Sequence, residues 1–151
     1  KLKLASLDRL SALPGDTLLC CGHEYTVANC VFALSVDAEN AVLQRRMQQA
    51  RAARTRGEPT VPVSLALERE TNPFLRVDEP ALRAACSREL GATDAHDRVT
   101  RFAWLRAEKI GFARRLETYK QAMPGPLRRA RAGVATLVVI GANFDYGVSL
   151  V

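Results

Sequence analysis

Hydrophobic and polar residues follow patterns typical of short helices along the first part of the chain. Leucines recur at every third position from Leu4 to Leu13, which predicts a short amphipathic helix that ends at the Pro-Gly-Asp turn of residues 14–16. The apolar run at 17–21 predicts a buried strand, and the mostly apolar stretch at 25–34 predicts a buried helix. The chain is therefore expected to begin with a helix, a strand and a second helix.

Further helices are predicted by residues that cap a helix or break one. Ser, Asp and Asn side chains accept hydrogen bonds from the first backbone N–H groups of a helix, whereas proline and glycine end one. The expected caps are Asp37 or Asn40 for a helix at about 39–56, Ser64 for one ending before Asn72-Pro73, Asp78 for one ending near Gly91, and Asp94 for one ending near Phe112.

The strand at 17–21 has few candidate partners in the chain. A strand is not stable alone, and residues 134–140 form the only other strand-like run. We therefore expect the opening segment to belong to a larger sheet that lies outside this chain. The first residue is Lys1, not methionine, which fits a processed chain or a fragment.

Length and charge narrow the class of protein. The chain has 151 residues, of which 48% are hydrophobic and 25% charged, as in one ordinary globular domain. The net charge is +6, and residues 113–151 contribute +4 of it. That region lacks the basic face with interleaved aromatic residues that favours nucleic acid, and its first half has the composition of a disordered segment.

No apolar run is long enough to span a membrane, and no signal peptide is evident. We expect neither a nucleic acid nor a membrane partner.

The stretch 20-CCGHEYTVANC-30 carries the candidate chemistry. Taken alone, His23 is a structural residue, a metal ligand or the base for a Cys20 or Cys21 nucleophile. A zinc site needs at least three protein ligands, and nothing near His23 or the only other histidine, His96, completes one. The cysteines lack zinc-finger spacing, and Cys20 and Cys21 are expected to be core residues with free thiols. Spacing alone thus indicates no catalytic site.

Several blocks in a fixed order resemble the glyoxalase II, or hydroxyacylglutathione hydrolase, family. They are CGHEYT, EPTVP, NPFLR and RAEK, within about residues 7–112, and they look most like the vertebrate branch of that family. The resemblance implies a mainly α chain, the C-terminal helical domain of a metallo-β-lactamase-fold hydrolase. It makes residues 1–24 the last helix and one terminal strand of the αββα sandwich. Residues 25–112 become the helical substrate-binding domain, and 113–151 a divergent basic tail.

The resemblance also implies an activity and its residues. The family hydrolyses S-D-lactoylglutathione to glutathione and D-lactate, a step of methylglyoxal detoxification, with two metal ions, zinc or iron. By resemblance, His23 is the last metal ligand beside the substrate, Tyr25 contacts glutathione, and Arg106 and Lys109 bind its glycyl carboxylate. Arg106 and Lys109 are three residues apart on a predicted helix and share a face. Without the resemblance, Arg106 and Lys109 are interpreted as a solvated cationic face whose charge repulsion is reduced by Glu108.

The chain departs from the family pattern in its metal ligands. The T-H-x-H-x-D-H motif, a later histidine and a bridging aspartate are absent, so at most one ligand, His23, is present. We therefore expect the C-terminal part of a thioester hydrolase that is inactive alone. The alternatives are a non-catalytic module that binds glutathione, another anion or a protein partner, and a product without function. We expect a cytoplasmic monomer, with the mitochondrion as the alternative location.

Overall fold

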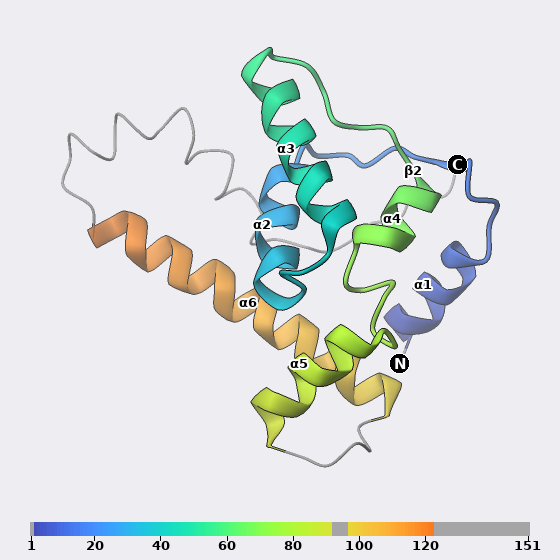
Figure 1. Cartoon of the computed structure of the whole chain (residues 1–151), viewed down its shortest axis with the longest axis vertical. Coiled ribbons are helices and arrows are strands. Elements are labelled where there is room, and N and C mark those ends of the chain that lie inside the picture. Colours follow the sequence, from blue (N-terminus) through green and yellow to red (C-terminus); the bar gives the residue numbers. More distant parts are fainter. Residues whose placement is uncertain (1, 92–96, 123–151) are drawn as a thin grey trace.

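The computed structural model describes residues 2–91 and 97–122. Within these residues the chain is mainly α-helical, as expected, with one small antiparallel sheet. The elements are α1 (Leu2–Ser11), β1 (Leu18–Leu19), α2 (Thr26–Val36), α3 (Ala41–Thr55), β2 (Val63–Ser64), α4 (Leu65–Thr71), α5 (Pro80–Leu90) and α6 (Arg98–Ala122). Figure 1 shows α2 and α3 side by side. In that view α6 runs below them, and α4 and α1 lie to their right.

The helix boundaries confirm most of the predicted caps. The Asn40 side chain accepts a hydrogen bond from the backbone N–H of Leu43 (3.0 Å) and starts α3, while Asp37 ends α2. Ser64 caps α4 in the same way, through the N–H of Leu67 at 3.3 Å. Helix α5 ends at Gly91, whose φ of 64° is a left-handed conformation that glycine adopts without strain.

One predicted cap is wrong, and another lies outside the described residues. The N-cap of α5 is Glu79, because Asp78 forms an ion pair with Arg101 of α6 instead of capping its own helix. Asp94, the expected cap of the last helix, falls in the segment that the structure does not describe. Helix α6 begins later, and the Asp97 carboxylate accepts from the N–H of Thr100 at 2.7 Å.

The opening strand has a partner within the chain that the sequence pattern did not identify, while its expected place in a larger sheet stays a prediction. β1 pairs with β2 in antiparallel register, with Leu18 opposite Ser64 and Leu19 opposite Val63. The strand is also shorter than the predicted 17–21. It ends before Cys20 and Cys21, which are exposed, so the prediction that both are core residues is wrong as well. Strand alternation does not position a side chain that follows the strand end.

Helix α6 is longer than predicted. It was expected to end near Phe112, yet it continues to Ala122, so the start of the segment expected to be disordered is helical. Residues 113–122, ARRLETYKQA, are mostly Ala, Arg, Leu, Glu, Lys and Gln, the residue types with the highest helix propensity. The strand-like run at 134–140 lies outside the described residues. No helix of the described part is both long and apolar enough to cross a membrane.

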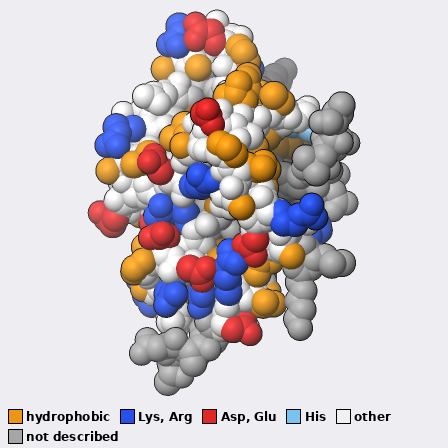
Figure 2. Space-filling view, turned by 90° about the vertical axis from the view of Figure 1, so that its right-hand side faces the viewer, with side chains coloured by type: hydrophobic (Ala, Val, Ile, Leu, Met, Phe, Trp, Pro, Cys, Tyr) orange, Lys and Arg blue, Asp and Glu red, His pale blue; other side chains and the backbone are white. Residues whose placement is uncertain are grey.

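Two hydrophobic clusters meet at α2. One face of α2 packs on α3 through residues such as Cys30 and Leu43, and the other contributes Phe32 to a cluster with α1, α5 and α6. Because α2 is buried on both sides, its few polar residues lie close to neighbouring helices. On the face that Figure 2 shows, acidic and basic side chains intermingle in the lower half, and hydrophobic side chains gather above them.

Candidate functional site

His23 and Tyr25 lie at the corner where the chain leaves β1 and enters α2. The backbone N–H of Tyr25 donates to the His23 carbonyl at 3.2 Å, and Tyr25 is the N-cap residue of α2. This tight turn stacks the two rings, with centroids 5.0 Å apart and planes 14° from parallel. His23 is exposed and Tyr25 is half-buried, so the turn presents an imidazole to solvent beside a phenol.

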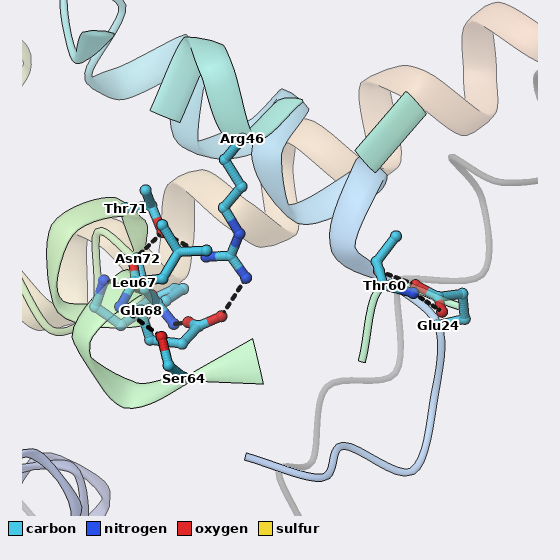
Figure 3. A network of polar contacts seen from close by, with 9 residues as sticks. Glu24, Arg46, Thr60, Ser64, Leu67, Glu68, Thr71 and Asn72 are labelled. Carbon is cyan, nitrogen blue, oxygen red and sulfur yellow. Dashed lines mark hydrogen bonds and ion pairs between the residues drawn. The ribbon is translucent and has the colours of Figure 1, made fainter. Parts of the chain in front are cut away.

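Glu24 ties the corner between β1 and α2 to the loop before β2. Its carboxylate accepts hydrogen bonds from both the backbone N–H (2.8 Å) and the hydroxyl of Thr60, in the loop before β2 (Figure 3). Arg54 of α3 approaches the same carboxylate at 4.0 Å. The two residues that flank Glu24 in sequence, His23 and Tyr25, are thereby tied to a loop more than thirty residues away.

Lys109 reaches from α6 to α2 and is partly withdrawn from water. Its Nζ donates to Oδ1 of Asn29 at 2.6 Å and lies 5.1 Å from the centroid of the Phe32 ring. Burial lowers the pKa of the Lys109 ammonium to about 8, against the opposing influence of Cys30 and Glu68. The face of an aromatic ring attracts a cation, so Asn29 and Phe32 together hold the ammonium on α2.

Lys109 and Tyr25 are linked through Asn29, in the first turn of α2. Asn29 donates its backbone N–H to the carbonyl of Tyr25 at 2.9 Å, the first hydrogen bond of α2. Asn29 therefore links Tyr25, through its backbone, to the partly buried cation of Lys109, a residue 84 positions from Tyr25 in sequence. We call Tyr25, Asn29, Phe32 and Lys109 the α2–α6 site.

Arg106 occupies a different environment from Lys109, although both are on α6. It is exposed, and within the described part of the chain it has no ion pair or hydrogen bond from its side chain. Glu108, which the solvated-face interpretation assigned to ease these charges, lies 3.8 Å from Arg115 instead. Lys109 is not a solvated surface residue, so that interpretation fits Arg106 but not Lys109.

The described residues do not form a metal site. No group of three or more His, Cys, Asp or Glu side chains among them is arranged to hold a metal ion, and His96 is outside the described residues. The exposed imidazole of His23, stacked on Tyr25, can provide one ligand only to a centre whose other ligands come from elsewhere.

The four thiols are free, as predicted. Cys30 and Cys86 are buried, and burial raises the pKa of both. Burial also raises the pKa of Cys21, with Glu68 acting in the same direction, although its side chain reaches the surface. A raised pKa leaves these three thiols largely protonated at neutral pH, which argues against a nucleophilic role for them.

Sequence reasoning missed Asn29 and Phe32. A signal for Asn29 existed, because it is the one amide in the mostly apolar stretch at 25–34. A polar residue on a buried helix face needs a hydrogen-bonding partner. The partner could not be identified from the sequence, since Lys109 follows 80 residues later.

Comparison with known proteins gives the chain a family. The family model described as hydroxyacylglutathione hydrolase C-terminus matches residues 24–112. Proteins named hydroxyacylglutathione hydrolase from Xanthomonas campestris pv. campestris (strain B100) and Xylella fastidiosa (strain M12) are 52% and 53% identical over 107 and 109 residues. These matches cover 71% and 72% of this chain but 42% of each relative.

The match covers only part of each relative. A third relative, the hydroxyacylglutathione hydrolase of Xanthomonas oryzae pv. oryzae (strain MAFF 311018), is 54% identical over 108 residues and is again covered to 42%. The chain thus spans less than half the length of the curated relatives that it matches. These relatives are bacterial, and the expected likeness to the vertebrate branch stays a prediction. The chain belongs to the hydroxyacylglutathione hydrolase C-terminus family.

Proposed function

We propose that this chain is the substrate-binding, C-terminal part of a hydrolase that cleaves S-(2-hydroxyacyl)glutathione. In this reaction water splits the thioester, and S-D-lactoylglutathione gives glutathione and D-lactate. The family match and the names of the relatives support the class of reaction. The single observation that carries the binding role is the partly buried Lys109 ammonium, which donates to Asn29, one helical turn after Tyr25.

The α2–α6 site suits the anionic end of glutathione. A carboxylate near Lys109 would interact in a partly desolvated environment, where the attraction between opposite charges is stronger than in water. Arg106, one turn earlier on α6, would add a forked donor from the exposed side. Tyr25 would contact the peptide with its ring or hydroxyl while the turn with His23 keeps it in place.

The hydrolytic centre would depend on residues beyond this chain. We propose that residues 1–24 complete a sandwich domain, residues 25–112 form the substrate-binding domain, and His23 is one ligand of a zinc or iron centre. Because the described residues form no metal site, we expect the chain alone to bind glutathione without hydrolysing its thioesters. Hydrolysis of S-D-lactoylglutathione by the purified, zinc-loaded chain would refute the proposed inactivity.

Glutathione titration followed by NMR tests the binding role. We expect Lys109→Met and Arg106→Gln to weaken binding, by about tenfold or more for Lys109, because each removes a charged donor to the carboxylate. Arg83→Gln, which removes the same charge from an exposed position of α5, is the matched control. Glutathione with an amidated glycyl carboxylate should bind the wild type weakly. Equal binding by wild type and Lys109→Met would refute the proposed site.

The alternative function is a binding module without chemistry. It would predict the same titrations, so the distinguishing measurement is made on the chain joined to a metallo-β-lactamase sandwich domain of a relative. Hydrolysis by that joined protein, lost in Lys109→Met through a raised KM, supports the hydrolase. Binding without hydrolysis, despite a full metal content, supports the module.

A further inference from the structure

Asn29 occupies the centre of the α2–α6 site. It lies one turn after Tyr25 and three residues before Phe32, so it shares a helix face with the ring that lies beneath the ammonium. Its Oδ1 accepts from Lys109 Nζ at 2.6 Å, a short distance typical of a charge-assisted hydrogen bond. Asn29 is thus the direct link between α2 and the cation of α6.

The chemistry of the partner fixes the orientation of the Asn29 amide. An ammonium group can only donate, so the atom that faces Lys109 must be the carbonyl oxygen, not the nitrogen. The Nδ2 group with its two N–H donors is then on the other arm of the same planar amide. No side chain or carbonyl of the described residues accepts from it. Asn29 itself is half-buried, so its amide remains reachable from solvent.

We infer that Asn29 is a positioning residue of the anion site, which holds the Lys109 ammonium through Oδ1 and offers Nδ2 as a further donor to the same carboxylate. The inference rests on the proposed function, because the carboxylate is the glycyl end of glutathione. It adds to the site a residue to which the resemblance gave no role.

A neutral amide is the side chain that this role requires. An aspartate at the same place would form an ion pair with Lys109 and compete with the ligand for its charge, whereas an apolar residue would remove the hydrogen bond from the ammonium to residue 29. Charged and titratable groups that act on Lys109 include the Cys30 thiol of α2 and Glu68 of α4, whose carboxylate is paired with Arg46 of α3. The amide therefore fixes the cation without cancelling its charge.

The test compares two variants of Asn29 in the whole chain, with reduced glutathione as the probe. Asn29→Asp changes one atom group and should weaken glutathione binding about tenfold or more, because the new carboxylate neutralises Lys109. Asn29→Ala should weaken binding less, by about threefold to tenfold, since the ammonium keeps its charge but loses its hydrogen bond. Gln48→Glu, the same amide-to-acid change on an exposed position of α3, is the control and should bind like the wild type.

A pH series separates positioning from a merely structural effect. The wild type should lose glutathione affinity as the pH rises through about 8, where Lys109 loses its proton. In Asn29→Asp, the added carboxylate should move the titration of Lys109, followed by the 13Cε resonance, to higher pH. Loss of burial would also raise this titration point, toward 10.5, so the shift supports the inference only where circular dichroism shows an intact fold. In Asn29→Ala, which adds no carboxylate, the titration of Lys109 should stay near 8 or move lower.

The outcomes distinguish the inference from the function on which it rests. If Lys109→Met loses glutathione binding while Asn29→Asp and Asn29→Ala keep it, the role of Asn29 is refuted and the anion site stands. If Lys109→Met binds glutathione like the wild type, the anion site is refuted and the inference fails with it. Should Asn29→Asp unfold, as judged by circular dichroism, the result with Asn29→Ala decides.

Discussion

Two cations inside the helical bundle, Arg46 and Lys109, are held in opposite ways. Arg46 of α3 is 9% exposed and donates to the Glu68 carboxylate at 2.5 Å and to the Thr71 hydroxyl (Figure 3). Lys109 of α6 donates to the neutral amide of Asn29 at 2.6 Å and lies over an aromatic ring. Arg46 thus donates to a carboxylate, whereas the hydrogen bond from Lys109 to Asn29 and its contact with Phe32 are with neutral groups.

The charge of the partner separates a structural cation from one suited to binding. Removing either member of the Arg46–Glu68 pair would leave an uncompensated charge between α3 and α4. Asn29 and Phe32 contact the Lys109 ammonium without neutralising it, in a partly desolvated environment. An anion that reaches this cation gains more than it would at the protein surface. Arg46 thus joins α3 to α4, and the ligand role that we propose for Lys109 distinguishes it from Arg46.

The largest expected effect is the loss of stability in Arg46→Ala. Glu68, whose side chain is 14% exposed, would keep its hydrogen bond from Asn72 but lose its counter-charge. Breaking a buried pair in this way destabilises a protein by about 3–5 kcal/mol. Urea unfolding followed by circular dichroism measures the change in the free energy of unfolding.

Arg45→Ala is the matched control for this change. Arg45 is the exposed neighbour on the same helix, so its removal should alter the free energy of unfolding by less than about 0.5 kcal/mol. A loss in Arg46→Ala no larger than in the control would mean that the pair does not join α3 to α4, and the contrast with Lys109 would disappear.

The second largest expected effect is a gain in stability. Lys109→Met should raise the free energy of unfolding at pH 7 by about 1–2 kcal/mol, because methionine fills a similar volume without the cost of a partly desolvated charge. The lost hydrogen bond to Asn29 offsets part of this gain. Lower stability in the variant than in the wild type would show that the ammonium is a structural element like Arg46.

The pH dependence of that difference follows from the lowered pKa of Lys109. The unfolded chain keeps its proton up to pH 10.5, and the folded chain loses it near 8, so between these values the unfolded state binds more protons. Stability from this group therefore rises with pH across that window, and its cost is fully present below pH 8. The advantage of Lys109→Met should shrink between pH 8 and 10.5, measured by urea unfolding at each pH.

The sequence predicted local structure better than it predicted pairing. The leucine spacing of α1 and the caps Asn40 and Ser64 depend on neighbours within one helical turn, so they were predicted correctly. The partner of β1 was missed because β2 is only two residues long and follows a proline-containing loop, too short for alternation to be visible. Asp78 was misassigned because a distant arginine competes for its carboxylate.

The candidate site was predictable only in part, for the same reason. The family motifs marked His23, Tyr25, Arg106 and Lys109, and those roles remain predictions. No motif distinguished the exposed Arg106 from the partly buried Lys109, because that difference depends on how α6 packs on α2. Contacts between residues far apart in sequence require the fold itself.

The smallest expected effect concerns the Glu24 carboxylate, which accepts two hydrogen bonds from the neutral Thr60 and lies 4.0 Å from Arg54. Thr60→Val removes the hydroxyl that donates to Glu24 but keeps the backbone N–H that donates at 2.8 Å. The free energy of unfolding should fall by about 1 kcal/mol or less, the contribution of one hydrogen bond to a partly exposed charge. The exposed Thr55, whose hydroxyl bonds only within α3, provides the control Thr55→Val, which should cost less.

The same substitution tests whether Glu24 positions the binding corner. With one of its two tethers removed, the turn that stacks His23 on Tyr25 should become more mobile, which broadens or shifts the ring resonances of both residues in NMR spectra. Glutathione affinity should then fall by a smaller factor than in Lys109→Met, because Tyr25 is loosened while the charge remains. Thr60→Val could instead leave the ring resonances of His23 and Tyr25 unchanged and be as stable as Thr55→Val. That result would confine the role of Glu24 to its own loop and leave Asn29 and Phe32 as the groups that set the geometry of the α2–α6 site.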